Sequence, residues 1–251
     1  MRYQPLFQPK NKHLLIYEVY LLTGAVLTIT LNMGNLIEEQ LAVVLDVRFL
    51  TESAFVIRFE RNEINFNAGQ YVVLGTKDNP ERREYSIYSP VSADYLEALV
   101  LMVDKKSFSF QLSELQIGEG LFVRGPFGSF KLEETSPVDK NIFIASGTGI
   151  SPFHSMVLSY PELNYTILHG VRNLDEGYER TTYPEGRYIQ CSSSEKGSEF
   201  YGRVTDYIRK NKPDLAAHYY LCGNSAMIDE VWNLLKAADV PFTNIHAEVY
   251  F

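Results

Sequence analysis

Short apolar runs separated by polar turns fill the first half of the chain. From Gln40 to about Thr135, β-branched and aromatic residues recur in runs of strand length. This spacing is typical of an antiparallel barrel or sandwich. A short helix is expected over 109–115, where Leu112 and Leu115 lie on one helical face. The predicted strands span 41–50, 54–60, 70–76, 84–89, 97–105 and 120–127.

The pattern changes around Pro137, where continuous apolar strands begin to alternate with helical segments. Such alternation indicates a parallel sheet with helices on its faces. The sequence therefore predicts two domains, a β-barrel followed by a doubly wound α/β unit. In the second domain the predicted strands span 141–146, 164–170, 187–193 and 218–223, with helices over 150–160, 202–211 and 225–239, and residues 245–251 end the chain.

The N-terminal segment 13–31 is rich in apolar residues and resembles a signal sequence or a membrane anchor. Glu18 interrupts it, and its apolar part is short for a spanning helix. No Ala-x-Ala cleavage site follows. We therefore expect residues 1–38 to be a soluble extension, packed on the surface or poorly ordered, without stable membrane insertion. A membrane anchor and a translation start at Met33 are the alternatives.

Composition and charge exclude several classes of function. The chain of 251 residues is 45% apolar and 22% charged, which is ordinary for a globular protein. Its net charge of −8 argues against nonspecific nucleic-acid binding. Two cysteines, Cys191 and Cys222, cannot supply a disulfide framework or an iron–sulfur cluster, and they suit a reducing cytosol. No paired histidine motif is present, so we expect no metal site.

A glycine loop marks a candidate phosphate site. The segment "ASGTGISPF", residues 145–153, follows a predicted strand and opens a helix. Its glycines permit a sharp turn that exposes backbone N–H groups, and the helix N-terminus favours an anion. Thr148 adds a hydroxyl donor. In a parallel α/β domain this arrangement favours a nucleotide pyrophosphate over a bare turn. The predicted binding residues are Gly147, Thr148, Gly149 and Pro152.

A second strand end carries a candidate ring pocket. In "YLCGNSAMIDEV", residues 220–231, Cys222 and Gly223 stand at the carboxyl end of a predicted strand. Open α/β sheets bind ligands at this edge, and a glycine lets a flat ring approach closely. The alternative is an ordinary small buried cysteine. With the glycine loop nearby, the segment predicts a nicotinamide pocket to which we also assign Met227.

Two segments of the barrel combine charge with aromatic rings. "RREYSIYSP", residues 82–90, carries cations, rings and hydroxyls on one short extended segment. Such a set suits a ligand that has a phosphate, a flat ring and a polar ring edge. "RGPFGSF", residues 124–130, places an arginine and two glycines where the barrel should meet the second domain. For this second segment a plain turn is the alternative.

Five short motifs, taken together, resemble those of the ferredoxin–NADP⁺ reductase family, in particular its bacterial branch. Arg83-x-Tyr85-Ser86 is similar to the family's flavin-binding R-x-Y-S motif, and "GPFGSF", "GTGISPF", "CGNSAM" and "HAEVYF" follow in the family's order. The resemblance covers about residues 40–251. It implies a six-stranded antiparallel flavin-binding barrel over 39–136 and an NAD(P)-binding α/β domain over 137–251.

The resemblance also implies roles for single residues. Arg83 would neutralise the flavin pyrophosphate, and Tyr85 would pack against the isoalloxazine. Ser86 would stand near flavin N5, and Cys222 would orient the nicotinamide. The implied roles of three residues at the end of the chain are to orient the nicotinamide or relay protons (Glu248), to cover the flavin ring (Tyr250) and to pack on the adenine end (Phe251). Further implied cofactor contacts are Ile87, Tyr88, Gly125, Gly128, Ser129 and Phe130.

The chain departs from the family pattern at two places. Where relatives read Gly-x-x-Ser-x-x-Leu, this chain has "KSFSFQL", so Ser109 matches and Lys106 replaces the glycine. FAD is the expected flavin, with FMN as the alternative. At the adenosine end of the nucleotide, Ser193 and Ser194 precede Glu195 instead of an arginine. Lys196, Arg203 and Arg172 are nearby substitute cations for a 2′-phosphate. Glu195 can instead hold a ribose hydroxyl, as acidic residues do for NADH, so NADH is slightly favoured over NADPH.

The implied function is a flavin-dependent NAD(P)H oxidoreductase that passes single electrons to a separate ferredoxin or flavodoxin-type carrier. A local basic face at Lys77, Arg82, Lys105 and Lys106 would meet that carrier. The enzymatic alternatives are an NAD(P)H:flavin reductase and the reductase component of an oxygenase. A non-enzymatic alternative is a redox-sensing module that binds flavin or nucleotide. His169 is expected to be a structural histidine, or else to border the nucleotide.

Overall fold

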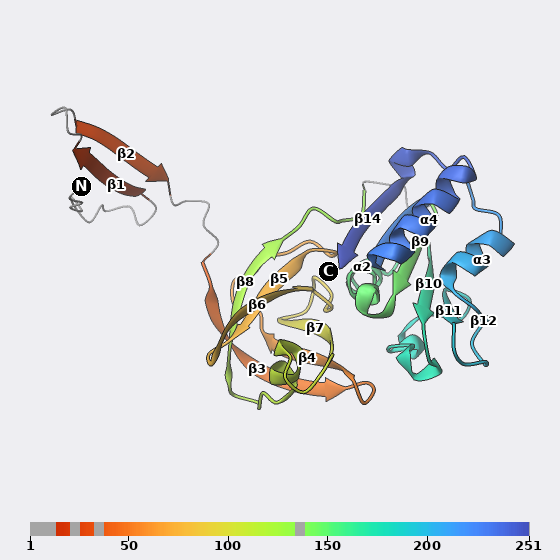
Figure 1. Cartoon of the computed structure of the whole chain (residues 1–251), viewed down its shortest axis with the longest axis horizontal. Helices are drawn as coiled ribbons and strands as arrows, with labels where there is room; N and C mark the ends of the chain where they lie inside the picture. Colours follow the sequence, from red (N-terminus) through yellow and green to blue (C-terminus); the bar gives the residue numbers. More distant parts are fainter. Residues whose placement is uncertain (1–13, 21–25, 33–37, 134–138, 251) are drawn as a thin grey trace. The chain divides into compact units, whose positions relative to one another are not determined.

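The computed structural model describes residues 14–20, 26–32, 38–133 and 139–250, which belong to two compact units, Met1–Glu39 and Gln40–Phe251. In the first unit β1 (Leu14–Tyr20) and β2 (Val26–Asn32) form an antiparallel pair (Figure 1). The sequence reading did not predict this hairpin. No helix in the described ranges is long and apolar enough to cross a membrane.

Six antiparallel strands form the first part of the second unit, as predicted. Their order in the sheet is β6-β5-β8-β3-β4-β7, and a bridge between Ile87 and Ala98 joins the two ends. A short helix, α1 (Phe108–Ser113), lies between the last two barrel strands, β7 and β8. The strands are β3 (Gln40–Phe49), β4 (Ala54–Glu60), β5 (Tyr71–Thr76), β6 (Asn79–Ser86), β7 (Tyr95–Leu101) and β8 (Gly120–Phe127).

Strand β4 shows how the barrel is attached to the α/β part. Successive side chains of a strand point to opposite faces. Phe55 and Ile57 therefore enter the barrel core, whereas Ala54 and Val56 join the apolar cluster of the α/β part. Four consecutive residues are buried because both faces are covered. A strand with this continuous apolar pattern lies between two cores.

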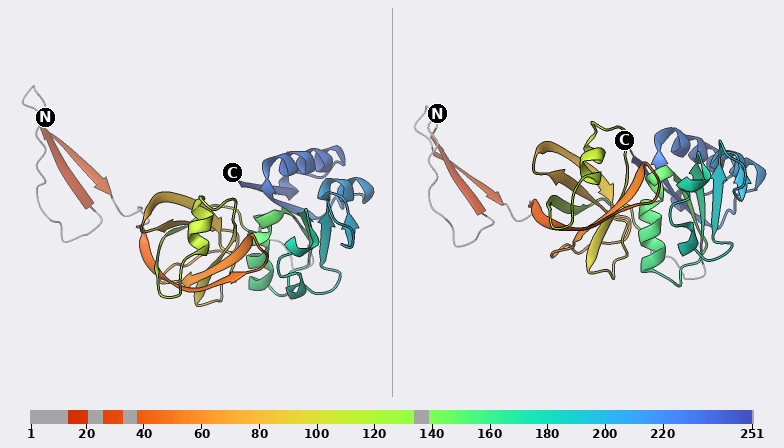
Figure 2. Two further views of the ribbon diagram at one scale, coloured as in Figure 1. Left: turned by 60° about the horizontal axis from the view of Figure 1, so that its bottom comes forward. Right: turned by 90° about the horizontal axis from the view of Figure 1, so that it is seen from below.

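The α/β part is a six-stranded parallel sheet in the order β12-β11-β10-β9-β13-β14, as the alternating pattern predicted. Helix α2 covers the face towards the barrel, and α3 and α4 cover the other face (Figure 2). The two-residue strand β12 was not predicted. The elements are β9 (Asn141–Ser146), η2 (Gly147–Ile150), α2 (Ser151–Ser159), β10 (Tyr165–Val171), β11 (Tyr188–Ser192), β12 (Phe200–Tyr201), α3 (Val204–Lys210), β13 (His218–Asn224), α4 (Ser225–Ala237) and β14 (Ile245–Tyr250).

The end of "RREYSIYSP" seats the barrel on helix α2. The ring of Tyr88 stacks on His154 with centroids 3.9 Å apart, and its hydroxyl donates to Glu179 at 2.8 Å. Arg48 donates to the same carboxylate at 2.7 Å. These contacts bury the Tyr88 side chain completely between the two parts, and its contact with a flavin stays a prediction. Ile87 is likewise fully buried, in the barrel core.

Candidate functional site

A serine of the barrel meets a carboxyl group of the last strand. Ser86 ends β6, and its side chain is hydrogen-bonded to that of Glu248 on β14. Burial, together with nearby Glu84, raises the pKa of Glu248 to about 7. Its Oε2 atom is buried without a hydrogen-bond partner. The structure thus brings two predicted catalytic residues together and leaves one carboxyl oxygen available to a donor.

Gly128 and Tyr71 complete the surroundings of this carboxyl group. A Cβ atom on Gly128 would lie 3.1 Å from the Tyr71 ring and 3.7 Å from Glu248 Oε1, so the predicted glycine allows a close approach. The Tyr71 hydroxyl is hydrogen-bonded to Glu84, and burial raises the pKa of Tyr71. Tyr71 was not predicted from the sequence as a site residue. It lies directly opposite Ser86 in the β5–β6 pair.

Strand β6 divides the R-x-Y-S motif between its two sides. Arg83 and Tyr85 alternate with Glu84 and Ser86, so the cation and the ring lie on the other side from the hydroxyl. Arg83 is exposed and forms an ion pair with Glu81 at 2.6 Å. Tyr85 packs against the barrel core, and burial raises its pKa. Strand β6 ends the strand order, and a ligand can approach it along its exposed Arg83 and Glu84 side chains.

The second predicted flavin-phosphate segment does not present its serine. Ser107, and not Ser109, caps helix α1 by accepting the N–H of Phe110 at 3.2 Å. Ser109 is 2% exposed, and its hydroxyl accepts the Val103 N–H at 3.3 Å and lies 2.9 Å from the Ser107 hydroxyl. Direct contact between Ser109 and a phosphate would require these bonds to open. Lys105 and Lys106, just before this helix, are both exposed and could supply a cation to such a ligand.

The "GPFGSF" segment has two exposed residues between buried ones. Gly128 and Ser129 are exposed. Phe130 is buried and packs against Phe153 and Tyr220, with ring centroids 6.0 and 6.1 Å away. Gly125 is buried against β5. Gly125 and Phe130 make packing contacts here, and their contacts with a cofactor stay a prediction.

A cavity of about 720 Å³ lies at the carboxyl ends of the parallel strands. This is the edge where open α/β sheets bind ligands. Five predicted nucleotide residues line it: Gly147, Thr148, Ser193, Gly223 and Met227. The sequence reading had named Arg172 and Arg203 only as substitute cations, and both line the cavity. Further lining residues that it missed are Ser146, Glu176, Thr205 and Glu230.

Two glycines allow the glycine loop to pack closely against the Cys222-Gly223 end of β13. A Cβ on Gly149 would lie 2.7 Å from the carbonyl carbon of Cys222, and one on Gly223 would lie 2.8 Å from Ser146 O. The Ser146 hydroxyl accepts the Asn224 N–H at 3.0 Å. The thiol of Cys222 is fully buried, so Gly223 lines the cavity in its place. Buried Gly149 and Pro152 shape the loop without reaching the cavity.

At the end of the cavity where adenosine is expected, one serine hydroxyl is hydrogen-bonded to the backbone. Ser193 and Ser194 are both exposed, and the Ser193 hydroxyl donates to Val171 O at 3.3 Å. The carboxylate of Glu195 accepts the Leu174 N–H at 2.9 Å, which competes with its expected bond to a ribose. At the end of the chain, the Tyr250 backbone pairs with Asn224 in the sheet. The Tyr250 side chain and all of Phe251 lie outside the described residues.

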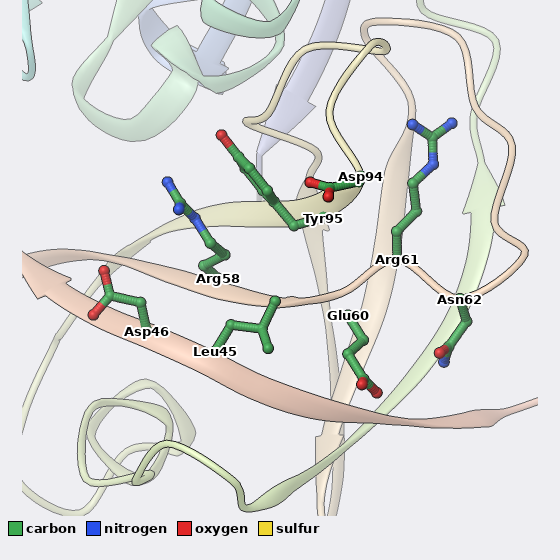
Figure 3. A pocket seen from close by; sticks show the side chains of 8 residues that line it. All are labelled: Leu45, Asp46, Arg58, Glu60, Arg61, Asn62, Asp94 and Tyr95. Atoms are coloured by element: carbon green, nitrogen blue, oxygen red, sulfur yellow. The ribbon is translucent and has the colours of Figure 1, made fainter.

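A second hollow of about 380 Å³ lies on the outer face of the barrel (Figure 3). Its cations already have partners in the fold. Arg58 donates two hydrogen bonds to Glu97 and lies 3.9 Å over the Tyr95 ring. Arg61 donates to the carbonyls of Val91 and Ala93. We assign no ligand to it. Within the described ranges, no cluster of three His, Cys, Asp or Glu residues is arranged to hold a metal ion.

Comparisons with known proteins agree with the two-part architecture. The family model of the oxidoreductase FAD-binding domain matches residues 36–132, and that of the oxidoreductase NAD-binding domain matches 143–232. The phenol hydroxylase P5 protein of Acinetobacter pittii (strain PHEA-2) is 28% identical over 86% of this chain and 67% of its own length. The ferredoxin–NADP reductase of Azotobacter vinelandii is 28% identical over 81% of this chain and 90% of its own.

A solved structure shares the fold. The ferredoxin NADP⁺ reductase from Neisseria gonorrhoeae, described with bound FAD and NADP, superposes with a TM-score of 0.75. The match covers 85% of this chain and 99% of that protein at 18% sequence identity. At this identity the likeness concerns the fold alone, so the roles of single residues depend on the geometry described above.

Proposed function

Because the chain belongs to the ferredoxin reductase family of FAD- and NAD-binding oxidoreductases, we propose that it transfers hydride between a nicotinamide nucleotide and FAD and passes electrons singly to a separate carrier. The barrel, over 39–136, would hold the flavin, and the α/β part, over 137–251, would hold the nucleotide. A bound flavin supplies the chemistry that converts a two-electron donor into one-electron steps. The residues of this chain would bind and orient the flavin and shield it from water.

Strand β6 has the groups that a flavin needs. Exposed Arg83 can exchange its partner Glu81 for a pyrophosphate by charge-assisted hydrogen bonds. Half-buried Tyr85 offers a ring anchored on the barrel core, which keeps its orientation fixed when a flat ligand packs on it. The open edge of β6 gives a ligand access to both. This donor set fits FAD, whose pyrophosphate requires a cation, and FMN is the alternative.

The cavity at the sheet edge suits a dinucleotide. Its glycine loop lies at the N-terminal end of η2 and α2, where backbone N–H groups attract phosphate. At the other side, Gly223 leaves room for a flat ring, and Met227 provides an apolar contact. Cys222 is fully buried next to Gly223 in β13 and acts as a packing group there.

The observation that carries the proposal is a connected set of residues from the nucleotide cavity to the flavin strand. Cys222 lies directly opposite Glu248 in the β13–β14 pair, and Glu248 is hydrogen-bonded to Ser86 of β6. A nicotinamide at Gly223 and a flavin at Ser86 would therefore both border this carboxyl group. Its pKa of about 7 lets Glu248 hold or release a proton at Oε2 near neutral pH.

The electron acceptor would be a ferredoxin-type protein or an oxygenase component, since relatives named as a ferredoxin–NADP reductase and as the reductase component of a terephthalate 1,2-dioxygenase both match the chain. The reductase component of an oxygenase differs from a ferredoxin reductase only in this partner. We propose a cytosolic location, which the buried thiols of Cys191 and Cys222, neither of them in a disulfide, support.

Stopped-flow spectroscopy of the purified flavoprotein tests the proposal. Addition of NADH or NADPH should bleach the flavin absorbance within seconds, and a ferredoxin should then restore it. A protein that loses its flavin on gel filtration but still turns over added flavin would indicate an NAD(P)H:flavin reductase. Tight binding of flavin and nucleotide without any bleaching would overturn the enzymatic function and favour a sensing module.

A further inference from the structure

His169 joins the interior of the sheet to the glycine loop. It lies in β10 and is fully buried. Its Nε2 is 2.8 Å from the carbonyl oxygen of Gly147, and its Nδ1 is 2.7 Å from the Tyr188 hydroxyl. A carbonyl only accepts, so Nε2 carries the proton and Nδ1 accepts from Tyr188. Burial lowers the pKa of His169 to about 4, which keeps the imidazole neutral at physiological pH.

The partner of His169 is itself held in place. The Tyr188 ring stacks on Tyr183 with centroids 5.1 Å apart and planes 3° from parallel. The Tyr183 hydroxyl is 2.8 Å from Nδ1 of His154, and His154 stacks on Tyr88. Both ring nitrogens of His169 are hydrogen-bonded, and the tyrosine that bonds to Nδ1, Tyr188, is itself held by stacking. The imidazole therefore has one orientation.

The bond to Gly147 decides where the next backbone donor points. The carbonyl of Gly147 and the N–H of Thr148 belong to one planar trans peptide unit, so they point in opposite directions. His169 holds the carbonyl towards the interior. The Thr148 N–H then points away from the imidazole, on the side where Gly147 and Thr148 line the cavity. Gly147 has a φ of +53° with no neighbour near its Cβ position, so local sterics alone do not fix this plane.

We propose that His169 is a positioning residue for the nicotinamide nucleotide: by holding Gly147 O, it aims the Thr148 N–H at the pyrophosphate. This role rests on the proposed function, because it assumes that a dinucleotide binds at this loop. Without the imidazole donor, the peptide plane is free to rotate and the ligand loses an oriented donor to a charged group. Loss of such a bond corresponds to about tenfold in affinity.

The test compares His169→Leu, which removes the donor, with His169→Gln, whose amide nitrogen can replace Nε2. Calorimetric titration of the flavoprotein with NAD⁺ or NADP⁺, whichever binds the wild type more tightly, measures affinity without turnover. His169→Leu should raise Kd about tenfold, while His169→Gln should stay within about threefold of the wild type. In stopped-flow experiments the loss in His169→Leu should appear in the nucleotide concentration needed, with the limiting rate changed less than twofold.

A second pair of variants keeps the test open if His169→Leu does not fold. Tyr188→Phe removes only the hydroxyl that fixes His169 and should raise Kd about threefold. Tyr219→Phe is the matched control, since Tyr219 is also a buried tyrosine of the same sheet but its hydroxyl is bonded to Asp214, away from the loop. Its Kd should equal that of the wild type.

The possible results separate the two proposals. An unchanged Kd in His169→Leu and Tyr188→Phe would overturn the positioning role, whatever the activity. An equal loss in His169→Leu and His169→Gln would also overturn it and indicate general packing. A wild type that binds the nucleotide but shows no flavin bleaching would instead contradict the proposed function and leave the affinity comparison valid.

Discussion

Ser86 at the end of β6 is hydrogen-bonded to Glu248 on β14, so the barrel and the parallel sheet meet at one carboxyl group. The bond lowers the pKa of Glu248, but burial and the charge of Glu84 raise it more, to about 7. The group therefore changes its protonation state within the physiological pH range. It also lies where the proposed flavin and nicotinamide sites converge.

Replacement of Glu248 by glutamine should change how stability depends on pH. A carboxyl whose pKa is higher in the folded than in the unfolded chain favours folding when protonated. This contribution is complete below the unfolded pKa of 4.5 and is lost as the pH rises through about 7. Urea unfolding at pH 5 and pH 8 should show the wild type losing about 1–2 kcal/mol relative to Glu248→Gln, after allowance for solvent screening. Parallel pH profiles for the two proteins would contradict the assignment.

Replacement of Arg83 by alanine should weaken flavin binding. The guanidinium is exposed on the edge strand, and its loss removes charge-assisted hydrogen bonds worth about 1.5–3 kcal/mol. The Kd for FAD should rise roughly 10- to 100-fold in a fluorescence titration. Lys212→Ala makes the same change in net charge at an exposed site of the α/β part and should leave the Kd unchanged. Full flavin content in Arg83→Ala would refute the phosphate role.

The coenzyme preference should follow the charge near Ser194. Glu195 is exposed beside Ser193 and Ser194, and its carboxylate repels a 2′-phosphate, so flavin reduction should be faster with NADH than with NADPH. Ser194→Arg should raise kcat/KM for NADPH about tenfold by adding a cation. Glu195→Gln retains an acceptor for the Leu174 N–H and should raise it by a smaller factor. Faster reduction of the wild type by NADPH would show that Arg172 and Arg203 outweigh Glu195.

Two glycines of the same loop should differ in their tolerance of alanine. A Cβ on Gly149 meets the Cys222 and Gly223 backbone, so Gly149→Ala should lower the free energy of unfolding by about 3 kcal/mol. Gly147 has open space at its Cβ position and only a left-handed φ of +53°, so Gly147→Ala should cost about 1 kcal/mol. Equal destabilisation of Gly149→Ala and Gly147→Ala in urea melts would show that Gly149 is not in close contact with the Cys222-Gly223 end of β13.

The sequence by itself determined the two folding patterns and the position of the binding edge. The short apolar run of β4 between polar turns, and the apolar strand before Gly147 that leads into a helix, specify barrel strands and parallel strands because these patterns are local. The carboxyl end of each parallel strand faces one edge, so the glycine loop and Gly223 could be assigned to one cavity from sequence alone.

The tertiary structure decided which side chains reach that cavity and which support it. Tyr88, Phe130 and Cys222 belong to recognisable motifs, yet all three are buried, because their environment comes from segments far away in the chain. The contacts of Glu248 with Ser86, and of His169 with Gly147, join residues whose separation in sequence gives no local signal. Periodicity determines which face of its own element a residue occupies, whereas the partner on that face is fixed only when the two parts pack together.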